Sequence, residues 1–187
     1  MRIIGGTLRG RVVNPPAGYE ARPTTDFAKE GLFNTLQNEF DFEECILLDL
    51  FGGTGSISAE FVSRGGLGGE CVEMNKKNAL FIRKMHASLG IRCVKTIHCN
   101  VFDFIDLCSK QYDLIFADPP YRLQGLEGLP DKILGRTFKD GDSEKHILAD
   151  NGYLILEHGG EYNFSEHPNF VREKKYGNVH FSFFELK

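Results

Sequence analysis

The tetrapeptide Asp118-Pro119-Pro120-Tyr121 has the residue types and the spacing to do chemistry. It follows an apolar run, 112–117, of the kind found in buried strands. Each proline fixes its own φ angle and lacks a backbone N–H, and Pro120 also restricts the conformation of Pro119. The result is a stiff turn that presents a carboxylate, carbonyl oxygens and an aromatic ring. These groups suit a planar amine, so the motif predicts methylation of an exocyclic amino group on a nucleobase.

A glycine-rich loop, Asp49-Leu50-Phe51-Gly52-Gly53-Thr54-Gly55, ends a second apolar run. Open α/β sheets bind ligands beyond the carboxyl ends of their strands, and glycines let the backbone approach a ligand closely. A dinucleotide would need a third small residue in the pattern, at a position where this chain has Ser58. S-adenosylmethionine has no pyrophosphate, and Asp49 is placed to bind its amino group. The loop therefore favours S-adenosylmethionine.

Two further strand ends supply candidate cofactor ligands. Glu73 ends the run 69–73, where a carboxylate can accept hydrogen bonds from both ribose hydroxyls of either cofactor. Asn100 and Val101 follow the run 94–98, where the adenine should lie. Asn100 has two interpretations, because its side chain could bind the adenine edge or simply cap the next helix.

An alternation of strand and helix patterns must position these residues. Apolar residues at every fourth position predict a helix that Thr25 or Asp26 caps and that ends near Gln37. Continuous apolar runs predict strands at 45–50, 69–73, 94–98, 112–117 and 153–157. Helices are expected at 56–63, 76–89, 101–109 and, more loosely, 124–149. The fold class is therefore α/β, with an open, mostly parallel sheet and right-handed crossovers.

The last part of the chain reads as a hairpin. Two strand patterns, 170–175 and 179–186, flank the turn Tyr176-Gly177-Asn178. The connection is too short for a crossover, so these strands must be antiparallel.

Composition sets the class of protein. A chain of 187 residues fits one domain with a substantial core. The net charge of −4 counts mildly against a nucleic-acid partner, but residues 1–19, which read as extended or hairpin-like, contain three arginines and no acid. No apolar stretch approaches the ~20 residues that span a bilayer, and no signal peptide is evident, so a cytoplasmic location is expected.

Cysteine and histidine give no sign of a metal centre. The five cysteines are odd in number and none forms a CxxC pair, which argues against a disulfide framework and a zinc site. The histidines, including His98, His146, His158 and His180, show no ligand spacing. We therefore expect no metal site.

The motifs together resemble a known family. The glycine loop, Glu73, Asn100 and the Asp118–Tyr121 turn are similar to the motifs of class I S-adenosylmethionine-dependent methyltransferases that act on exocyclic amino groups. The head and tail of the chain resemble, more specifically, the small-subunit ribosomal RNA guanine-N2 methyltransferases of the RsmD type. The segments that carry this closer resemblance are Met1–Gly6, Arg9-Gly10, Arg22–Asp26, Glu30, Leu32–Asn34 and Arg172–Gly177.

This resemblance implies a Rossmann-like sheet of seven strands with helices on both faces and a C-terminal antiparallel hairpin. It also implies an RNA-facing N-terminal extension over residues 1–40 and a methyltransferase domain over residues 41–187. The implied partner is 16S rRNA in a partly assembled small ribosomal subunit, and the protein should be a monomer that contacts no membrane.

The same resemblance implies roles for individual residues. Asp118 and Pro119 would hold the target amine, and Tyr121 would stack on a flipped base, an interaction worth ~1–3 kcal/mol. Thr24, Thr25 and Arg22 would border the site, although Thr25 has the alternative role of a helix cap. The expected cofactor-binding residues are Asp49, Phe51, Gly53, Gly55, Glu73, Asn100, Val101, Thr24 and Thr25, and the expected RNA-binding residues are Arg9, Arg11 and Arg22.

Four alternatives remain open at this point. A DNA adenine-N6 methyltransferase would use the same turn, but this chain has little room for a target-recognition domain. A glutamine or protein methyltransferase usually has Asn at the position of Asp118. A nicotinamide-dependent oxidoreductase would share the sheet and Glu73, and Ser58 argues against it. The fourth alternative is an RNA-binding protein that has lost its catalytic activity.

Overall fold

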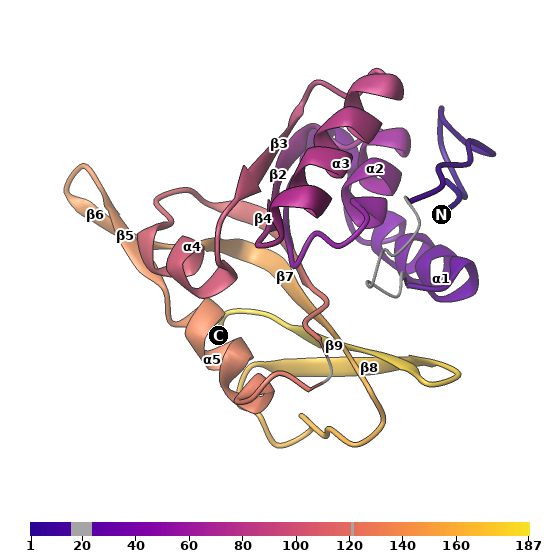
Figure 1. Ribbon diagram of the computed structural model, residues 1–187. Helices are drawn as coiled ribbons and strands as arrows, with labels where there is room; N and C mark the ends of the chain where they lie inside the picture. Colours follow the sequence, from indigo (N-terminus) through magenta and orange to yellow (C-terminus); the bar gives the residue numbers. More distant parts are fainter. Residues whose placement is uncertain (16–23, 121) are drawn as a thin grey trace.

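The computed structural model describes residues 1–15, 24–120 and 122–187. Within these residues, seven strands form one sheet in the order β3-β2-β1-β4-β7-β9-β8 (Figure 1). The parallel strands are β1 (Ile46–Leu50), β2 (Gly68–Glu73), β3 (Val94–His98), β4 (Tyr112–Ala117) and β7 (Leu148–His158). The antiparallel pair β8 (Phe170–Tyr176) and β9 (Val179–Phe184) completes the sheet. The predicted sheet and its closing hairpin are confirmed.

Helices cover both faces of this sheet because its central strands are apolar on both sides. On one face lie α1 (Asp26–Gln37), α2 (Ser56–Ser63) and α3 (Lys76–Ser88), and on the other lie α4 (Val101–Leu107) and α5 (Leu129–Leu134) (Figure 1). Successive strand residues point to opposite faces. Accordingly, Leu47 packs in the cluster that contains α1 and α2, whereas Leu48 packs with α4 and α5. None of the helices in the described ranges is long and apolar enough to cross a membrane.

The helix expected over 124–149 is wrong for most of its length. A 3-10 turn, η2 (Leu126–Gly128), leads into α5, and the chain then forms a hairpin of β5 (Thr137–Asp140) and β6 (Ser143–His146) that projects from the body (Figure 1). Gly141 has a φ of +62°, and an Asp-Gly pair at this point is a hairpin signal. Strand β7 also begins five residues earlier than the expected Tyr153, at Leu148.

The N-terminal segment is hairpin-like, as predicted, with an antiparallel bridge between Arg2 and Val12. Glu60 of α2, which is fully buried, anchors it by accepting hydrogen bonds from the N–H groups of Ile4 and Gly5, both at 2.8 Å. The same carboxylate lies 3.4 Å from the buried ammonium group of Lys29 on α1. The segment is therefore held against α1 and α2. Between α1 and β1, a 3-10 turn, η1 (Phe42–Glu44), places Phe42 in the core.

Candidate active site

The loops that carry the candidate residues meet at one edge of the sheet. Strand β1 pairs in parallel with β2 on one side and β4 on the other, and Leu50 aligns with both Val72 and Ala117. Phe51 of the glycine loop, Glu73 and Asp118 follow these three aligned positions directly. Adjacent parallel strands therefore bring the three motifs together at their carboxyl ends, the usual place for ligands in an open α/β sheet.

The glycine loop has an unusual backbone. Phe51, Gly53 and Gly55 have φ angles of 60°, 52° and 71°, and a non-glycine residue such as Phe51 rarely adopts this left-handed region. A Cβ atom at Gly52 would lie 2.5 Å from the Sγ atom of Cys71, so a larger residue would not fit there. The loop is thus folded tightly over the end of β2, and the Gly53 N–H donates a 2.9 Å hydrogen bond to Glu73 Oε2.

A cavity of about 310 Å³ opens beside this loop. Its size lies at the lower end of the range for small-molecule sites. Glu73 lies on its wall, and its carboxylate is fixed by two backbone donors, the N–H groups of Asn75 (2.6 Å) and Gly53 (2.9 Å). Burial raises the pKa of Glu73, while these donors oppose the shift. The complete lining consists of Phe51, Gly53, Glu73, Met74, Asn78, Asn100, Val101, Phe102, Pro120 and Leu123.

This cavity fits an adenosine group. Its lining includes apolar side chains that can hold a planar base. A carboxylate oxygen has more than one lone pair, so Glu73 can still accept hydrogen bonds from hydroxyl groups. Asn100 is the N-cap of α4, since its Oδ1 atom accepts a 2.8 Å hydrogen bond from Phe102 N. The same residue lines the cavity, so its interpretation as an adenine ligand stays a prediction.

A second, smaller cavity of about 40 Å³ adjoins the first, and the two share Phe51 and Gly53. Thr24, Asp49 and Asp118 contribute polar groups to its wall. Asp49 is only 2% exposed, and burial raises its pKa to about 7. Its Oδ2 atom accepts a 3.2 Å hydrogen bond from Ser58 N, which ties it to the first turn of α2.

Glu157, the second-last residue of β7, lies near Asp118 and Asp49. It is not among the site residues that the sequence predicts. It is 3% exposed, and its Oε2 atom accepts a 2.6 Å hydrogen bond from Thr24 Oγ1. Burial raises the pKa of Asp118 well above its ordinary value, and the negative charges of Glu157 and Asp49 add to the shift. The one feature of the sequence that could have indicated this residue is its position, since Glu157 is an acid directly after the apolar run Leu154–Leu156.

Several candidate residues line neither cavity. Gly55, in the glycine loop, is the N-cap of α2, and Pro119, in the turn, is buried. Arg9 and Arg11 are exposed on the N-terminal segment. Arg22 and Tyr121 lie outside the described residues.

Thr25 occupies the N-cap of α1, where its hydroxyl accepts a 3.2 Å hydrogen bond from Ala28 N. We predict that Thr25→Ala lowers the free energy of unfolding by ~1 kcal/mol, the usual cost of losing a cap, and leaves cofactor affinity unchanged. Urea denaturation and calorimetry would measure the two quantities. Thr25→Ser keeps the cap and should behave as the parent protein. A large loss of affinity in Thr25→Ala would instead place this hydroxyl on the cofactor.

A larger cavity, of about 680 Å³, lies at the opposite edge of the sheet. Ile46 and Gly68, the first residues of β1 and β2, contribute to its wall together with Phe138 of β5. It contains none of the candidate residues, and in open α/β sheets ligands bind at the carboxyl ends of strands. Size alone therefore does not identify the site in this protein.

Comparison with known proteins identifies the family and the fold. The family model described as conserved hypothetical protein 95 matches residues 1–185. Ribosomal RNA small subunit methyltransferase D of Buchnera aphidicola subsp. Baizongia pistaciae is 30% identical, over 98% of this chain and 91% of that protein. The solved structure of yhhF from Escherichia coli, described as a candidate methyltransferase, is 29% identical with a TM-score of 0.81, covering 100% of this chain and 99% of that one.

A more distant structure extends the likeness in fold. An RNA methyltransferase from Salinibacter ruber, in complex with S-adenosyl-L-homocysteine, has a TM-score of 0.63 at 13% identity, covering 87% of this chain and 92% of that one. The predicted class I methyltransferase fold is confirmed by these neighbours.

Proposed function

The chain belongs to the protein family described as conserved hypothetical protein 95, and from this membership we propose that it transfers a methyl group from S-adenosylmethionine to a guanine N2 amino group in small-subunit ribosomal RNA. The observation that carries the proposal is the position of Asp118. Its carboxyl group lines the small polar cavity that adjoins the Glu73 cavity, so an amine held there would face the cofactor. The Buchnera relative is named as a ribosomal RNA methyltransferase, which supports the choice of ribosomal RNA as substrate.

The residues present fit S-adenosylmethionine in its expected orientation. Glu73 would accept the ribose hydroxyls, the apolar wall near Val101 and Phe102 would hold the adenine, and Asp49 would bind the amino group. The cofactor supplies a methyl group on a positively charged sulfur, which makes that carbon electrophilic. The fixed loop and carboxylates place this carbon, and such positioning can supply several kcal/mol of the barrier.

Asp118 would activate the guanine amino group, which is the methyl acceptor. The lone pair of an exocyclic amine on guanine is delocalised into the ring, so the nitrogen is a weak nucleophile. When Asp118 and the carbonyl oxygens of its turn accept hydrogen bonds from the amino hydrogens, the lone pair becomes available and points in a fixed direction. The raised pKa of Asp118 also suits this carboxylate to accept the proton that the nitrogen releases.

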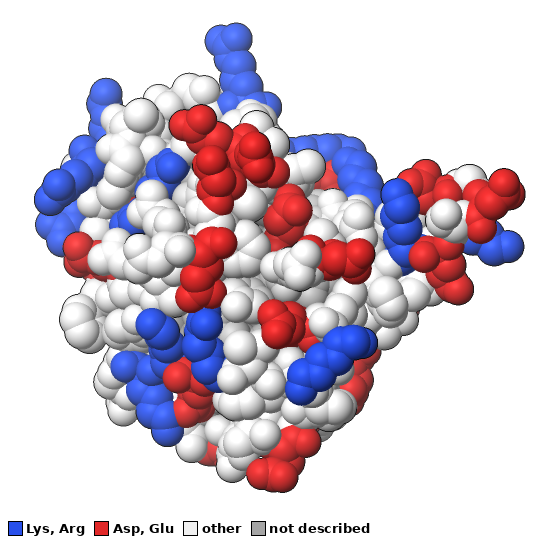
Figure 2. All heavy atoms as spheres, turned by 180° about the vertical axis from the view of Figure 1, so that it is seen from behind, with Lys and Arg blue, Asp and Glu red and all other residues white. Residues whose placement is uncertain are grey.

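RNA binding is assigned to the N-terminal part of the chain. We propose that residues 1–40 form an RNA-facing extension and that residues 41–187 form the methyltransferase domain. We also propose that the protein acts in the cytoplasm. Figure 2 supports this, since Lys and Arg gather at the left edge of that view, the edge that carries the N-terminal segment, while acids spread over its centre. Arg9 and Arg11, on the N-terminal segment, are exposed and can contact phosphates.

The proposal is tested by methyl transfer from labelled S-adenosylmethionine to isolated small subunits and to naked 16S rRNA. Label in ribosomal RNA from at least one of these substrates is the expected result, and comparison of the two identifies the assembly state that is recognised. Absence of label in both would contradict the substrate assignment.

The acidic cluster predicts a pH effect. Asp118 must be ionised to accept the amine hydrogens, so the rate should rise with pH through a midpoint above the usual carboxyl range. Glu157→Gln removes a negative charge beside Asp118 but keeps an oxygen for the Thr24 hydroxyl, and it should shift this midpoint to lower pH. Single-turnover rates across pH would measure the shift. Glu166→Gln, at an exposed position, is the control, and equal midpoints in all three proteins would refute the coupling.

A further inference from the structure

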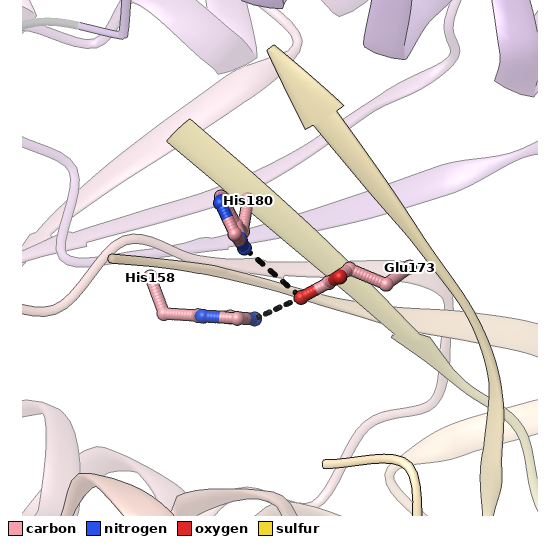
Figure 3. A group of neighbouring side chains, drawn as sticks. All are labelled: His158, Glu173 and His180. Atoms are coloured by element: carbon pink, nitrogen blue, oxygen red, sulfur yellow. Dashed lines mark hydrogen bonds and ion pairs between the residues drawn. The ribbon is translucent and has the colours of Figure 1, made fainter. Parts of the chain in front are cut away.

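Three side chains from three strands converge on one point beyond the proposed active site. Figure 3 shows His158 at the end of β7, Glu173 on β8 and His180 on β9 pointing toward one another. One nitrogen or oxygen atom from each lies within 4.8 Å of the other two. Glu173 Oε1 is 3.0 Å from His180 Nδ1 and 3.9 Å from His158 Nε2.

These spacings suit a tetrahedral metal ion. Zinc binds imidazole nitrogen and carboxylate oxygen at roughly 2.1 Å, which separates neighbouring ligand atoms by about 3.4 Å. The two measured separations lie on either side of this value. The third separation, between the two histidines, is at most 4.8 Å, so the three ligand atoms lie close enough together to be drawn onto one ion by side-chain rotation.

The register of the sheet holds the three residues in place. His158 and His180 are directly opposed on β7 and β9, and Glu173 is opposed to Ser182, two residues along β9. All three side chains therefore project from the same face of the sheet, at two neighbouring positions on that face. In the sequence, the three residues show no spacing typical of metal ligands. The sequence alone therefore predicts no metal site.

His158 is oriented as a metal ligand. Its ring is fully buried, and its Nδ1 atom lies 2.8 Å from the carbonyl oxygen of Gly159. A carbonyl has no hydrogen to give, so Nδ1 must carry the proton and Nε2 keeps its lone pair. A ring that donates to the backbone from one nitrogen and faces the ion with the other is the common arrangement around bound metals. At present Nε2 accepts from Ser182 Oγ at 2.8 Å, a bond that an ion would replace.

The remaining surroundings allow an ion to enter. The side chains of Glu173 and His180 are 21% and 12% exposed, so the site opens to solvent on their side. The exposed Lys175 pairs with the other carboxylate oxygen of Glu173, Oε2, at 2.9 Å, and leaves Oε1 directed at the histidines. The ring of Phe164, with its centroid 5.1 Å from that of His158, closes the inner side.

We propose that His158, Glu173 and His180 form a binding site for a divalent transition-metal ion, with Zn²⁺ as the best fit and water as the fourth ligand. Two imidazoles and one carboxylate select zinc over the hard cations Mg²⁺ and Ca²⁺. The ion would tie β7, β8 and β9 together one residue beyond Glu157, and so brace the strand end that carries this member of the acidic cluster.

The test is equilibrium dialysis and calorimetry of the whole protein with ZnCl₂, with MgCl₂ in parallel. We expect one Zn²⁺ per chain, no binding of Mg²⁺ at this site, and a rise in Tm of roughly 5–10 °C when Zn²⁺ is about 100-fold above Kd. CoCl₂ should give the strong visible absorption of tetrahedral Co²⁺. Failure of the parent protein to bind Zn²⁺ would overturn the proposal.

Variants locate the ion. His180→Gln and Glu173→Gln, which replace partly exposed groups by similar shapes, should weaken Zn²⁺ binding by roughly 10–100-fold or more. His167→Gln is the matched control, because His167 also pairs with a carboxylate, that of Asp131 at 3.1 Å, and is similarly exposed. It should bind Zn²⁺ like the parent. Unchanged binding in both site variants would place the ion elsewhere, for instance on the exposed thiol of Cys93, and would also overturn the proposal.

Discussion

Asp118→Asn should lower the single-turnover rate of methyl transfer by roughly 10²–10⁴-fold, the range lost when a positioned proton acceptor is removed. The amide keeps the size of the carboxyl and one acceptor oxygen, so the loss would measure the contribution of the negative charge. The affinity for S-adenosylmethionine should remain near that of the parent, because Glu73 and the glycine loop are intact. A rapid-quench assay and calorimetry would give the two quantities.

Stability separates this loss from unfolding. Burial and the nearby carboxylates raise the pKa of Asp118, so the folded protein binds a proton more tightly than the unfolded chain does. Stability contributed by this group is therefore lost as pH rises above the ordinary carboxyl pKa. Asp118→Asn removes that cost, and its free energy of unfolding at neutral pH should equal or exceed that of the parent.

Asp113→Asn is the matched control for Asp118→Asn. Asp113 lies on the same strand, β4, at its opposite end, and its Oδ2 atom accepts a 2.7 Å hydrogen bond from Ile46 N that an amide oxygen can replace. We expect parental activity from this variant. Full activity in Asp118→Asn would refute the role assigned to the carboxylate.

Glu73→Ala should raise the Kd for S-adenosylmethionine by about 100-fold. Two ribose hydroxyls donating to a carboxylate are each worth ~1.5–3 kcal/mol, and a total near 3 kcal/mol corresponds to this factor. The N–H groups of Gly53 and Asn75 also lose their acceptor, so the loop loses its fixed position. Isothermal titration calorimetry with S-adenosylmethionine and S-adenosyl-L-homocysteine would measure the change.

Two further variants and a second ligand, NAD, test the role of Glu73 and the identity of the cofactor. Glu73→Gln keeps one acceptor oxygen and should lose less affinity than Glu73→Ala, whereas Glu127→Gln, at an exposed position on η2, should lose none. The parent protein should not bind NAD. Parental affinity for S-adenosylmethionine in Glu73→Ala, or tight binding of NAD, would contradict the cofactor assignment.

The sequence predicted the central sheet, and it placed the candidate site residues at the ends of strands, because buried parallel strands are continuous apolar runs. Three of these runs have an acidic residue at or next to their carboxyl end, namely Asp49, Glu73 and Asp118. Parallel pairing of the strands places the loops that follow side by side. Half of the residues that line the proposed cofactor cavity, namely Phe51, Gly53, Glu73, Asn100 and Val101, could be named in this way without knowing any side-chain conformation.

The features that the sequence did not predict depend on pairing between distant residues. Glu157 joins Asp118 only because β7 lies beside β4, and Thr24 reaches it across 133 residues of sequence. His158, Glu173 and His180 meet through antiparallel register, which no local spacing reveals. The sequence does not predict the β5–β6 hairpin, because its short polar strands lack the continuous apolar residues that identify the other strands.

The chemical identity of the methylated nucleoside tests the proposed guanine-N2 activity directly. Small-subunit RNA would be incubated with the protein and labelled S-adenosylmethionine, digested to nucleosides and analysed by liquid chromatography and mass spectrometry, with Asp118→Asn alongside. We predict label in N2-methylguanosine for the parent protein and little or none for the variant. Label in N6-methyladenosine, or in any nucleoside without an exocyclic N-methyl group, would contradict the assignment of a guanine N2 amine as the methyl acceptor.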